Sequence, residues 1–173
     1  AININPDNID YKIKLANQFV KQKEYDDAIK IYQDLLEDGN KNKEIFINLG
    51  ALYQMNKEPK NAIKMFTKAI QIDSEDPVCH FNLASVYAFL SWWDEAAWEY
   101  KNTLKLKPDF YDAKYYLAKV FFHKAWYKQA SDMWKEYLED GTDKGKLKAA
   151  QKGIAEAEDW IKKLQGSTGR RED

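Results

Sequence analysis

The feature of this sequence that most constrains its fold is a pattern that recurs every 34 residues. Each copy of the pattern holds a leucine, a small residue directly after it, and an aromatic residue three positions further on. These columns are Leu15, Leu49, Leu83 and Leu117; Ala16, Gly50, Ala84 and Ala118; and Phe19, Tyr53, Tyr87 and Phe121. Self-similarity at a fixed period of this size is the signature of a repeat protein, in which each unit packs on the next.

Three further columns follow in every copy: an alanine, a large aromatic residue four positions later, and an aliphatic residue after another four. They are Ala28, Ala62, Ala96 and Ala130; Tyr32, Phe66, Tyr100 and Trp134; and Leu36, Ile70, Leu104 and Leu138. Spacings of three and four place side chains on one face of a helix, so each copy is predicted to be two helices. Because one helix pair cannot bury its own apolar face, the chain is predicted to be an all-α solenoid of antiparallel helix pairs.

The pattern resembles that of the tetratricopeptide repeat family. The second copy carries the family signature as Phe46, Leu49, Gly50, Tyr53, Ala62 and Phe66, with Phe46 in place of the usual tryptophan. Pro108 matches the family's terminal proline in the third copy, and the other copies lack it. The resemblance implies a right-handed superhelix with a concave surface lined by the first helix of each repeat. The four repeats are placed at residues 9–42, 43–76, 77–110 and 111–144.

The end of the chain departs from the repeat. Apolar residues from Leu147 to Leu164 step by three and four, which predicts one amphipathic capping helix over residues 145–166. A solenoid needs such a helix to cover its last open apolar face. Residues 167–173 are predicted to be a disordered tail or a remnant of cloning.

Charge and missing motifs exclude several classes of function. With 27 Lys and Arg against 28 Asp and Glu, the formal net charge is −1, which argues against a nucleic-acid binder. No apolar run approaches the ~18–20 residues of a membrane span, so direct insertion into a membrane is not expected. The single cysteine, Cys79, and the lack of a phosphate loop, nucleophile or metal motif predict a chain that is not an enzyme and holds no cofactor or metal. A cytoplasmic location is favoured; a processed exported protein and a fragment of a longer protein stay open.

The first helix of each repeat carries residues with no packing role inside the repeat, and these are predicted to bind a peptide segment of a partner protein. An asparagine amide donates and accepts at once, which matches a peptide backbone. The alternative is that the asparagines are solvated consensus residues and that neighbouring helices cover the aromatic ones. The candidate residues are Asn17, Asn48, Phe81, Asn82, Ser85, Phe89, Tyr115, Tyr116, Lys119, Phe122 and His123.

The predicted role is that of an adaptor or scaffold in a protein complex. The family's clamp for the carboxyl-terminal tails of heat-shock chaperones is disfavoured, because Ile13, Val78 and Asn82 stand where its cations should be.

Three tryptophans suggest a second interface. Trp92 and Trp126 occupy equivalent turn positions where the family has polar residues, and Trp98 lies one residue off the packing face of a second helix. Exposed tryptophan is uncommon on a monomer, so a self-assembling structural scaffold, a homo-oligomer, is the alternative function. The opposing interpretation is that these rings pack between repeats.

Overall fold

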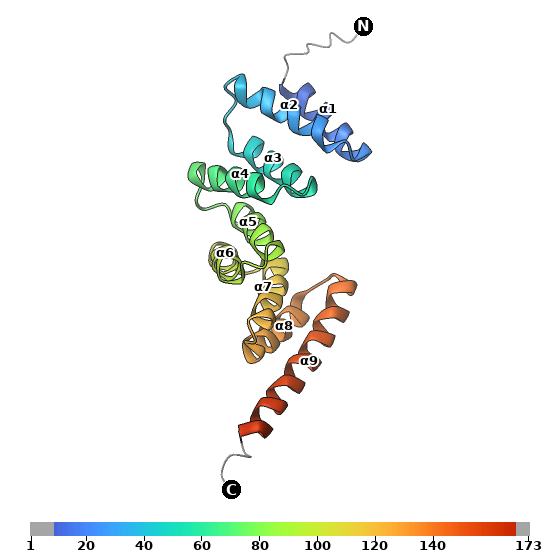
Figure 1. Ribbon diagram of the computed structural model, residues 1–173, viewed down its shortest axis with the longest axis vertical. Helices are drawn as coiled ribbons and strands as arrows, with labels where there is room; N and C mark the ends of the chain where they lie inside the picture. The colour runs from blue at the N-terminus through green and yellow to red at the C-terminus, as the bar shows by residue number, and fades with distance from the viewer. Residues whose placement is uncertain (1–8, 169–173) are drawn as a thin grey trace. The chain divides into compact units, whose positions relative to one another are not determined.

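The computed structural model describes residues 9–168, and these residues are helical with short connections and no strand (Figure 1). The helices are α1 (Ile9–Gln22), α2 (Tyr25–Glu37), α3 (Lys43–Met55), α4 (Pro59–Ile72), α5 (Pro77–Phe89), α6 (Trp93–Leu106), α7 (Tyr111–His123), α8 (Tyr127–Asp140) and α9 (Lys144–Thr168). No helix in this range is both long and apolar enough to cross a membrane. The last part of the predicted tail, residues 169–173, lies outside the described residues.

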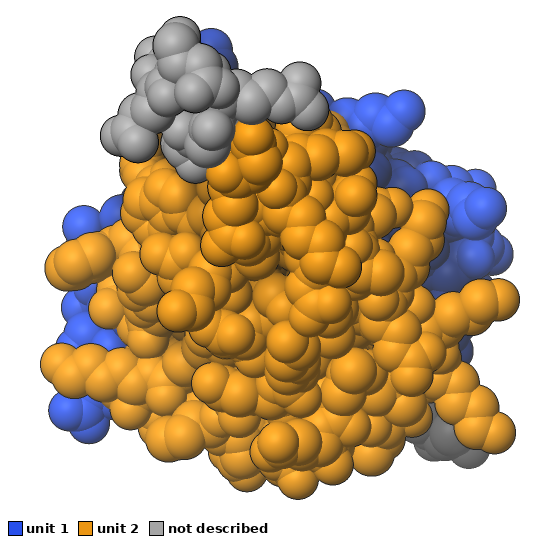
Figure 2. Space-filling view, turned by 90° about the horizontal axis from the view of Figure 1, so that it is seen from below, with its two compact units in different colours: residues 1–86 blue, residues 87–173 orange. Residues whose placement is uncertain are grey.

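The chain divides within α5 into two compact units, coloured separately in Figure 2, and each is described by itself. Unit 1 comprises residues 1–86 and unit 2 residues 87–173. In unit 1, α1 packs on α2, α2 on α3 and α3 on α4. In unit 2, α6 packs on α7, α7 on α8, α8 on α9, and α9 also returns to touch α7. Consecutive packing of this kind is the local order of an α-solenoid.

Two glycines, one in the repeat pattern and one in α9, are explained by close approach to aromatic rings. A Cβ atom on Gly50 of α3 would lie 2.7 Å from the ring of Phe66 on α4. A Cβ atom on Gly153 of α9 would lie 2.6 Å from the ring of Trp134 on α8. Phe66 and Trp134 occupy the same column of the repeat and both are buried. The same device therefore joins α3 to α4 in unit 1 and α9 to α8 in unit 2.

One column of the predicted core is wrong by a single residue. The aliphatic column of Leu36, Ile70, Leu104 and Leu138 is only half-buried. The fully buried residue comes directly before each of these: Leu35, Ala69, Thr103 and Tyr137. The reason is the helical period of 3.6 residues, because a residue seven positions after the alanine lies roughly 20° from it around the helix, whereas the eighth lies roughly 80° away.

The turn inside each helix pair is the same in all four copies. Two positions before the second helix of each pair, a residue other than glycine adopts a left-handed backbone. These residues are Lys23, Lys57, Ser91 and Ala125, and their φ angles are 57–62°. The N–H of the next residue donates to a carbonyl five positions earlier, as from Trp92 to Tyr87 (2.9 Å) and from Trp126 to Phe121 (2.9 Å). A left-handed residue followed by this backbone hydrogen bond is typical of the Schellman motif, which ends a helix and satisfies its last carbonyl groups.

Polar contacts tie successive repeats together at equivalent positions. In unit 1, the side-chain amide of Asn56 at the end of α3 donates to the carboxylate of Asp26 on α2 (2.8 Å). In unit 2, Lys124 after α7 pairs with Asp94 on α6. Both pairs join residues 30 positions apart, and the second pair lies two repeats after the first. The repeat therefore includes equivalent polar contacts as well as equivalent core residues.

Candidate functional site

A cavity of about 270 Å³ opens between α7 and α9 in unit 2. Its α7 wall holds four side chains at spacings of three and four, which place them on one helical face. These are Tyr115, Lys119, Phe122 and His123. The α9 wall has the same spacing, with Ala149, Lys152, Gly153 and Glu156, and the ring of Trp134 from α8 completes the lining. Four of the predicted binding residues therefore meet in one hollow.

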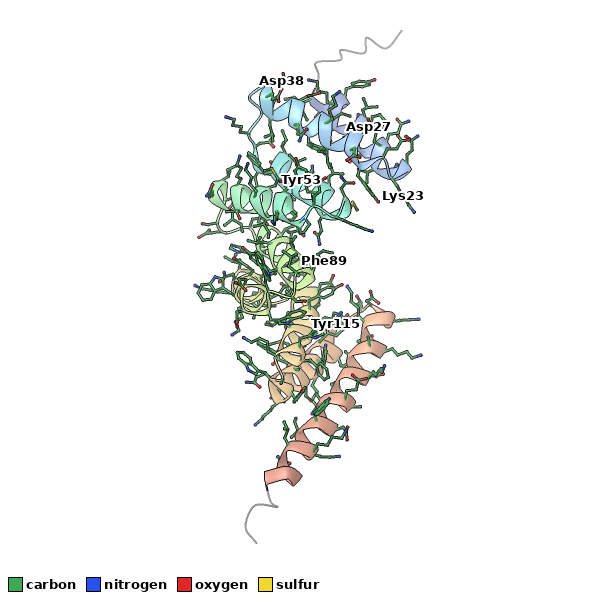
Figure 3. All side chains as sticks on the ribbon, viewed as in Figure 1. Lys23, Asp27, Asp38, Tyr53, Phe89 and Tyr115 are labelled. Atoms are coloured by element: carbon green, nitrogen blue, oxygen red, sulfur yellow. The ribbon has the colours of Figure 1, made fainter. Side chains whose placement is uncertain are left out.

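The cavity combines an apolar interior with a charged rim. Tyr115, which projects from α7 in Figure 3, is only 8% exposed, and burial raises the pKa of its hydroxyl. Lys119 holds its ammonium 5.9 Å from the Tyr115 ring centroid and 5.7 Å from that of Tyr116, within cation–π range. On the α9 side of the rim, the ammonium of Lys152 lies 3.5 Å from the carboxylate of Glu156. The site thus offers aromatic surface inside and two ammonium groups at its edge.

Aromatic neighbours hold Phe122 in place. Its ring centroid lies 5.9 Å from that of Trp134 and 5.2 Å from that of Tyr127. The next residue, His123, stacks flat on Trp93 of α6, with centroids 4.5 Å apart and planes at 5°. Side chains fixed by several ring contacts lose little entropy when a ligand arrives, so this wall of the cavity is preorganised.

The indole of Trp134 adds an unused hydrogen-bond donor to this site. The ring is 4% exposed and its Nε1 has no hydrogen-bond partner among the described residues. A buried donor without an acceptor is uncommon and costs free energy.

The other two predicted residues of unit 2 lie outside this cavity. Phe89 stands at the end of α5 and is 66% exposed (Figure 3). Tyr116 is half-buried; its ring stacks on Tyr100 with centroids 6.2 Å apart and lies 5.5 Å from the ammonium of Lys146.

In unit 1, the predicted residues divide by exposure. Asn17 on α1 and Asn48 on α3 are exposed, whereas Phe81, Asn82 and Ser85 on α5 are half-buried. Ser85 and Asn48 are engaged within the fold. The hydroxyl of Ser85 donates to the carbonyl of Phe81 (2.9 Å), one helical turn earlier.

Asn48 is the second of these engaged residues. Its side chain hydrogen-bonds the hydroxyl of Tyr32 on α2. Burial raises the pKa of Tyr32 and this bond lowers it, as expected for an amide that donates to the phenol oxygen. The Asn48 side chain thus has a partner inside unit 1 and is exposed at the surface.

The three tryptophans of the predicted second interface differ from one another. Trp92 stacks on Tyr87 with centroids 5.8 Å apart, and Trp126 packs on Phe121 at 5.6 Å. In each pair, the tryptophan whose backbone N–H closes the Schellman motif also packs its ring on the residue that accepts this hydrogen bond. An apolar contact of this kind often accompanies the motif. Trp98 has no such partner ring within residues 9–168 and is 66% exposed.

The α9 half of the cavity was not among the predicted binding residues. The helix was interpreted only as a cap, although its sequence carries a signal that would have shown a close helix approach. Ala150, Gly153 and Ala157 form a stripe of small residues at spacings of three and four, and all three are buried. Such a stripe lets one helix lie close against its neighbours.

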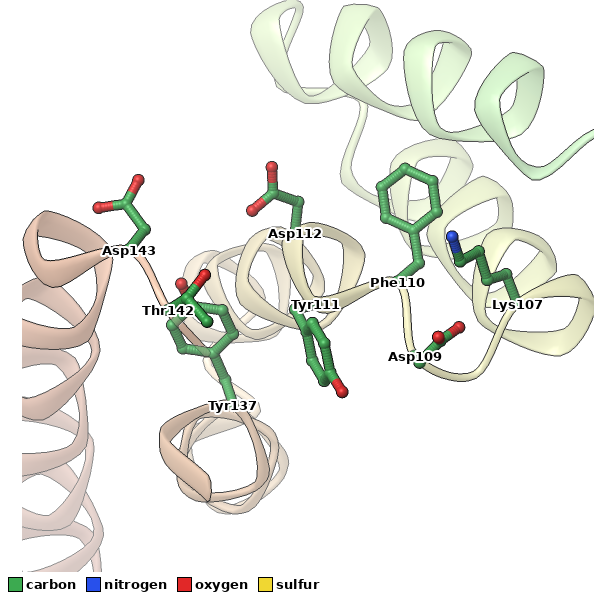
Figure 4. A pocket seen from close by; sticks show the side chains of 8 residues that line it. All are labelled: Lys107, Asp109, Phe110, Tyr111, Asp112, Tyr137, Thr142 and Asp143. Atoms are coloured by element: carbon green, nitrogen blue, oxygen red, sulfur yellow. The ribbon is translucent and has the colours of Figure 1, made fainter. Parts of the chain in front are cut away.

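A second cavity, of about 240 Å³, lies at the other end of α7 and is lined in part by carboxylates (Figure 4). Asp112 accepts a hydrogen bond from the ammonium of Lys146 at 2.7 Å. The Asp143 carboxylate accepts hydrogen bonds from the backbone N–H groups of Lys146 and Gly145, in the first turn of α9. These bonds lower the pKa of the Asp143 carboxyl. These acids therefore have structural partners.

The reactive residue types of unit 1 have structural roles. His80 Nε2 lies 3.1 Å from the carbonyl oxygen of Ser74. Burial raises the pKa of Cys79 to about 12, which keeps its thiol protonated and unreactive. Across residues 9–168 no cluster of His, Cys, Asp and Glu could hold a metal ion.

Comparison with known proteins agrees with this architecture. Residues 13–77 match the family model of the tetratricopeptide repeat. A tetratricopeptide repeat protein from Parabacteroides merdae superimposes with a TM-score of 0.76 at 17% identity, covering 94% of this chain and 67% of that one. YrrB, described as a TPR protein with an unusual peptide-binding site, gives 0.73 at 21% identity, covering 82% and 73%. A search of curated protein sequences finds no match.

A further solved structure contains a bound peptide. The first TPR of Spaghetti (RPAP3), bound to the HSP90 peptide SRMEEVD, gives a TM-score of 0.64 at 21% identity and covers 72% of this chain and 99% of that one. The match to the family model, the repeated columns and the consecutive helix pairs agree with one another. Residues 13–77 of this chain therefore match the tetratricopeptide repeat family, and the described helix pairs have the fold of its solved members.

Proposed function

We propose that this chain is a protein-interaction module that binds a peptide segment of a partner protein and acts as an adaptor or scaffold. The observation that carries the proposal is the cavity between α7 and α9, which is lined by four residues of α7 and four of α9. It is a concave site with aromatic walls and a few polar groups, the composition typical of a binding site.

The size of the cavity favours a single anchor side chain. Small-molecule and cofactor sites usually enclose roughly 300–1,000 Å³. At about 270 Å³ this cavity is smaller than that range and suits one large apolar side chain. Aromatic and aliphatic anchors seated in preformed pockets carry much of the binding energy of protein interfaces. We therefore assign the anchor contacts to Phe122 and Trp134.

The charged rim favours an acidic residue next to the anchor. Lys119 and Lys152 stand on opposite walls, and Lys152 is paired with Glu156. A carboxylate on the peptide would gain a charge-assisted hydrogen bond from Lys119. The preferred ligand is thus an apolar residue flanked by an acidic one.

Solved relatives support peptide binding as a use of this fold. The RPAP3 repeat holds a peptide of HSP90, and YrrB has a peptide-binding site. In this chain Ile13, Val78 and Asn82 occupy the positions of the clamp's cations, which favours a different peptide from a chaperone tail. The exposed side chain of Asn48 is assigned to the backbone of the peptide.

Selection from a phage-displayed peptide library tests the proposal. The chain should enrich peptides with an aromatic or large aliphatic residue next to Asp or Glu. Titration calorimetry on a selected peptide should show affinity reduced about tenfold or more by Phe122→Ala and by Lys119→Glu. Lys128→Glu, an exposed lysine on α8 outside the cavity, is the matched control. Equal loss in the control, or no loss in the two cavity variants, would contradict the proposal.

Self-assembly through the tryptophans is the second candidate function, and the exposure of Trp98 favours it. Trp92 and Trp126 support it less, because each ring packs on its own chain. Light scattering after gel filtration of the wild type and of Trp98→Lys distinguishes the two functions. A wild-type oligomer that the substitution dissolves would favour the scaffold.

A further inference from the structure

The third repeat reverses a pair of residues that the other repeats share. At two adjacent positions of the second helix, the other repeats have a charged residue followed by an apolar one: Lys30 and Ile31, Lys64 and Met65, Asp132 and Met133. The third repeat has Trp98 followed by Glu99. The charged residue of this pair is exposed in the other three repeats and the apolar one is buried or half-buried. The packing of the repeat therefore does not require a tryptophan at this position.

The reversal places an aromatic ring and carboxylates around one hollow. A depression of about 300 Å³ is lined by Tyr87, Asp94, Glu95, Trp98 and Glu99. Trp98 is 66% exposed, and Glu99 is half-buried where another repeat buries Met65. Burial raises the pKa of the Tyr87 hydroxyl, and the negative charges of Glu99 and Glu95 raise it further.

The hollow is negative overall. Asp94 is paired with Lys124, and Glu99 accepts a long hydrogen bond from Asn102 at 3.5 Å. Three carboxylates and one ammonium therefore face this region of unit 2. A cation over an aromatic face gains a favourable contact, and carboxylates beside the ring add charge pairing. A long basic side chain can lay its methylene groups on an indole while its charged end reaches an acid.

We propose that the hollow around Trp98 binds a lysine or arginine side chain of a basic segment in a partner protein. Trp98 supplies the face for the side chain's stem and charge, and Glu95 and Glu99 pair with its charged end. This surface is distinct from the α7–α9 cavity, whose rim lysines favour an acidic peptide. The chain would then hold two partners, or two parts of one partner, of opposite charge.

A double substitution tests the proposal without disturbing the repeat. Trp98→Lys with Glu99→Met restores the pair found in the second repeat, so the variant is expected to fold and to retain helicity by circular dichroism. The probe is a fluorescein-labelled hexa-arginine peptide, followed by fluorescence anisotropy at about 0.05 M salt and again at about 0.5 M. The wild type should bind at low salt, and the double variant should bind about tenfold more weakly.

The matched control is Asp132→Lys, which stands at the equivalent position of the fourth repeat and changes the net charge by the same amount, +2. This control should retain wild-type affinity. Equal weakening in the control would show attraction to net charge alone and overturn the proposal, as would equal binding by wild type and double variant. Sedimentation without peptide gives the remaining outcome. A wild-type dimer that the double variant loses, together with no binding of hexa-arginine, would assign the surface to a second copy and overturn the basic partner.

Discussion

The α3–α4 pair of unit 1 and the α7–α8–α9 group of unit 2 use the same packing with different consequences. In both, a buried aromatic ring faces a glycine, Phe66 against Gly50 and Trp134 against Gly153. The difference lies on the face that this packing leaves free. On α3 that face carries the exposed side chain of Asn48, whereas on α7 it carries aromatic rings and Lys119, which line a cavity with α9. Packing defines the fold here, and the unconstrained positions distinguish the two surfaces.

The largest effect is expected from removing the equivalent rings. Phe66→Ala and Trp134→Ala should each lower the free energy of unfolding by about 3–5 kcal/mol, because each leaves a buried cavity. Urea unfolding followed by circular dichroism measures both. Only Trp134 lines the α7–α9 cavity, so only its loss should also reduce affinity for a selected peptide. A loss below about 1 kcal/mol at either position would show that the two columns are not equivalent.

A smaller effect is expected at the facing glycines. Gly50→Ala and Gly153→Ala place a methyl group within 3 Å of a buried ring and should cost about 1–3 kcal/mol. Gly166→Ala, on the same helix as Gly153 with open space around it, is the control and should stabilise by up to ~1 kcal/mol. If Gly153→Ala also stabilises, α9 does not lie as close to Trp134 as the structure has it. Thermal unfolding of the three variants decides this.

The turns give the next effect. Glu24 and Glu58 follow the left-handed residue in unit 1, and Trp92 and Trp126 follow it in unit 2. Replacing either tryptophan with glutamate copies the unit 1 turn and removes a ring contact, so it should cost about 0.5–1.5 kcal/mol. Trp98→Lys should change stability by less than about 0.5 kcal/mol, since its ring is exposed. Equal costs at all three positions would contradict the distinction drawn between them.

The last test uses the natural position of the cysteine. Unit 1 holds the single cysteine, buried Cys79, and unit 2 holds all six tryptophans. Because the pKa of Cys79 is raised to about 12, its thiol should react with a disulfide reagent at pH 8 only after unit 1 opens. Labelling should be slow in buffer and should accelerate about 100-fold or more in Phe66→Ala. Rapid labelling of the folded wild type would show that the α5 end of unit 1 is open.

The helices and most of the core could be predicted from the sequence because both depend on spacings of three and four residues. The column of Leu36 was misplaced because an eight-residue spacing drifts off the stripe that a seven-residue spacing keeps. The partners of Trp92 and Trp126 depend on left-handed turns at Ser91 and Ala125, and neither residue type signals such a backbone.

The candidate site was predictable only on its α7 side. Tyr115, Lys119, Phe122 and His123 follow from their position on a first helix. Lys152 and Gly153 belong to the site because α9 returns to touch α7, a contact between helices that are not adjacent in sequence. Local periodicity does not contain that information, although the small residues of α9 indicate that it packs closely on something.

The most direct test of the proposed peptide site is a chemical-shift map of the ¹⁵N-labelled chain titrated with a peptide selected for binding. The largest shifts are expected at the amides of Lys119 and Phe122 on α7 and of Lys152 and Gly153 on α9, with smaller ones at Asn48. Shifts confined to α6 or to α1 and α2, with the α7–α9 amides unchanged at saturation, would contradict the assignment of the cavity as the anchor site.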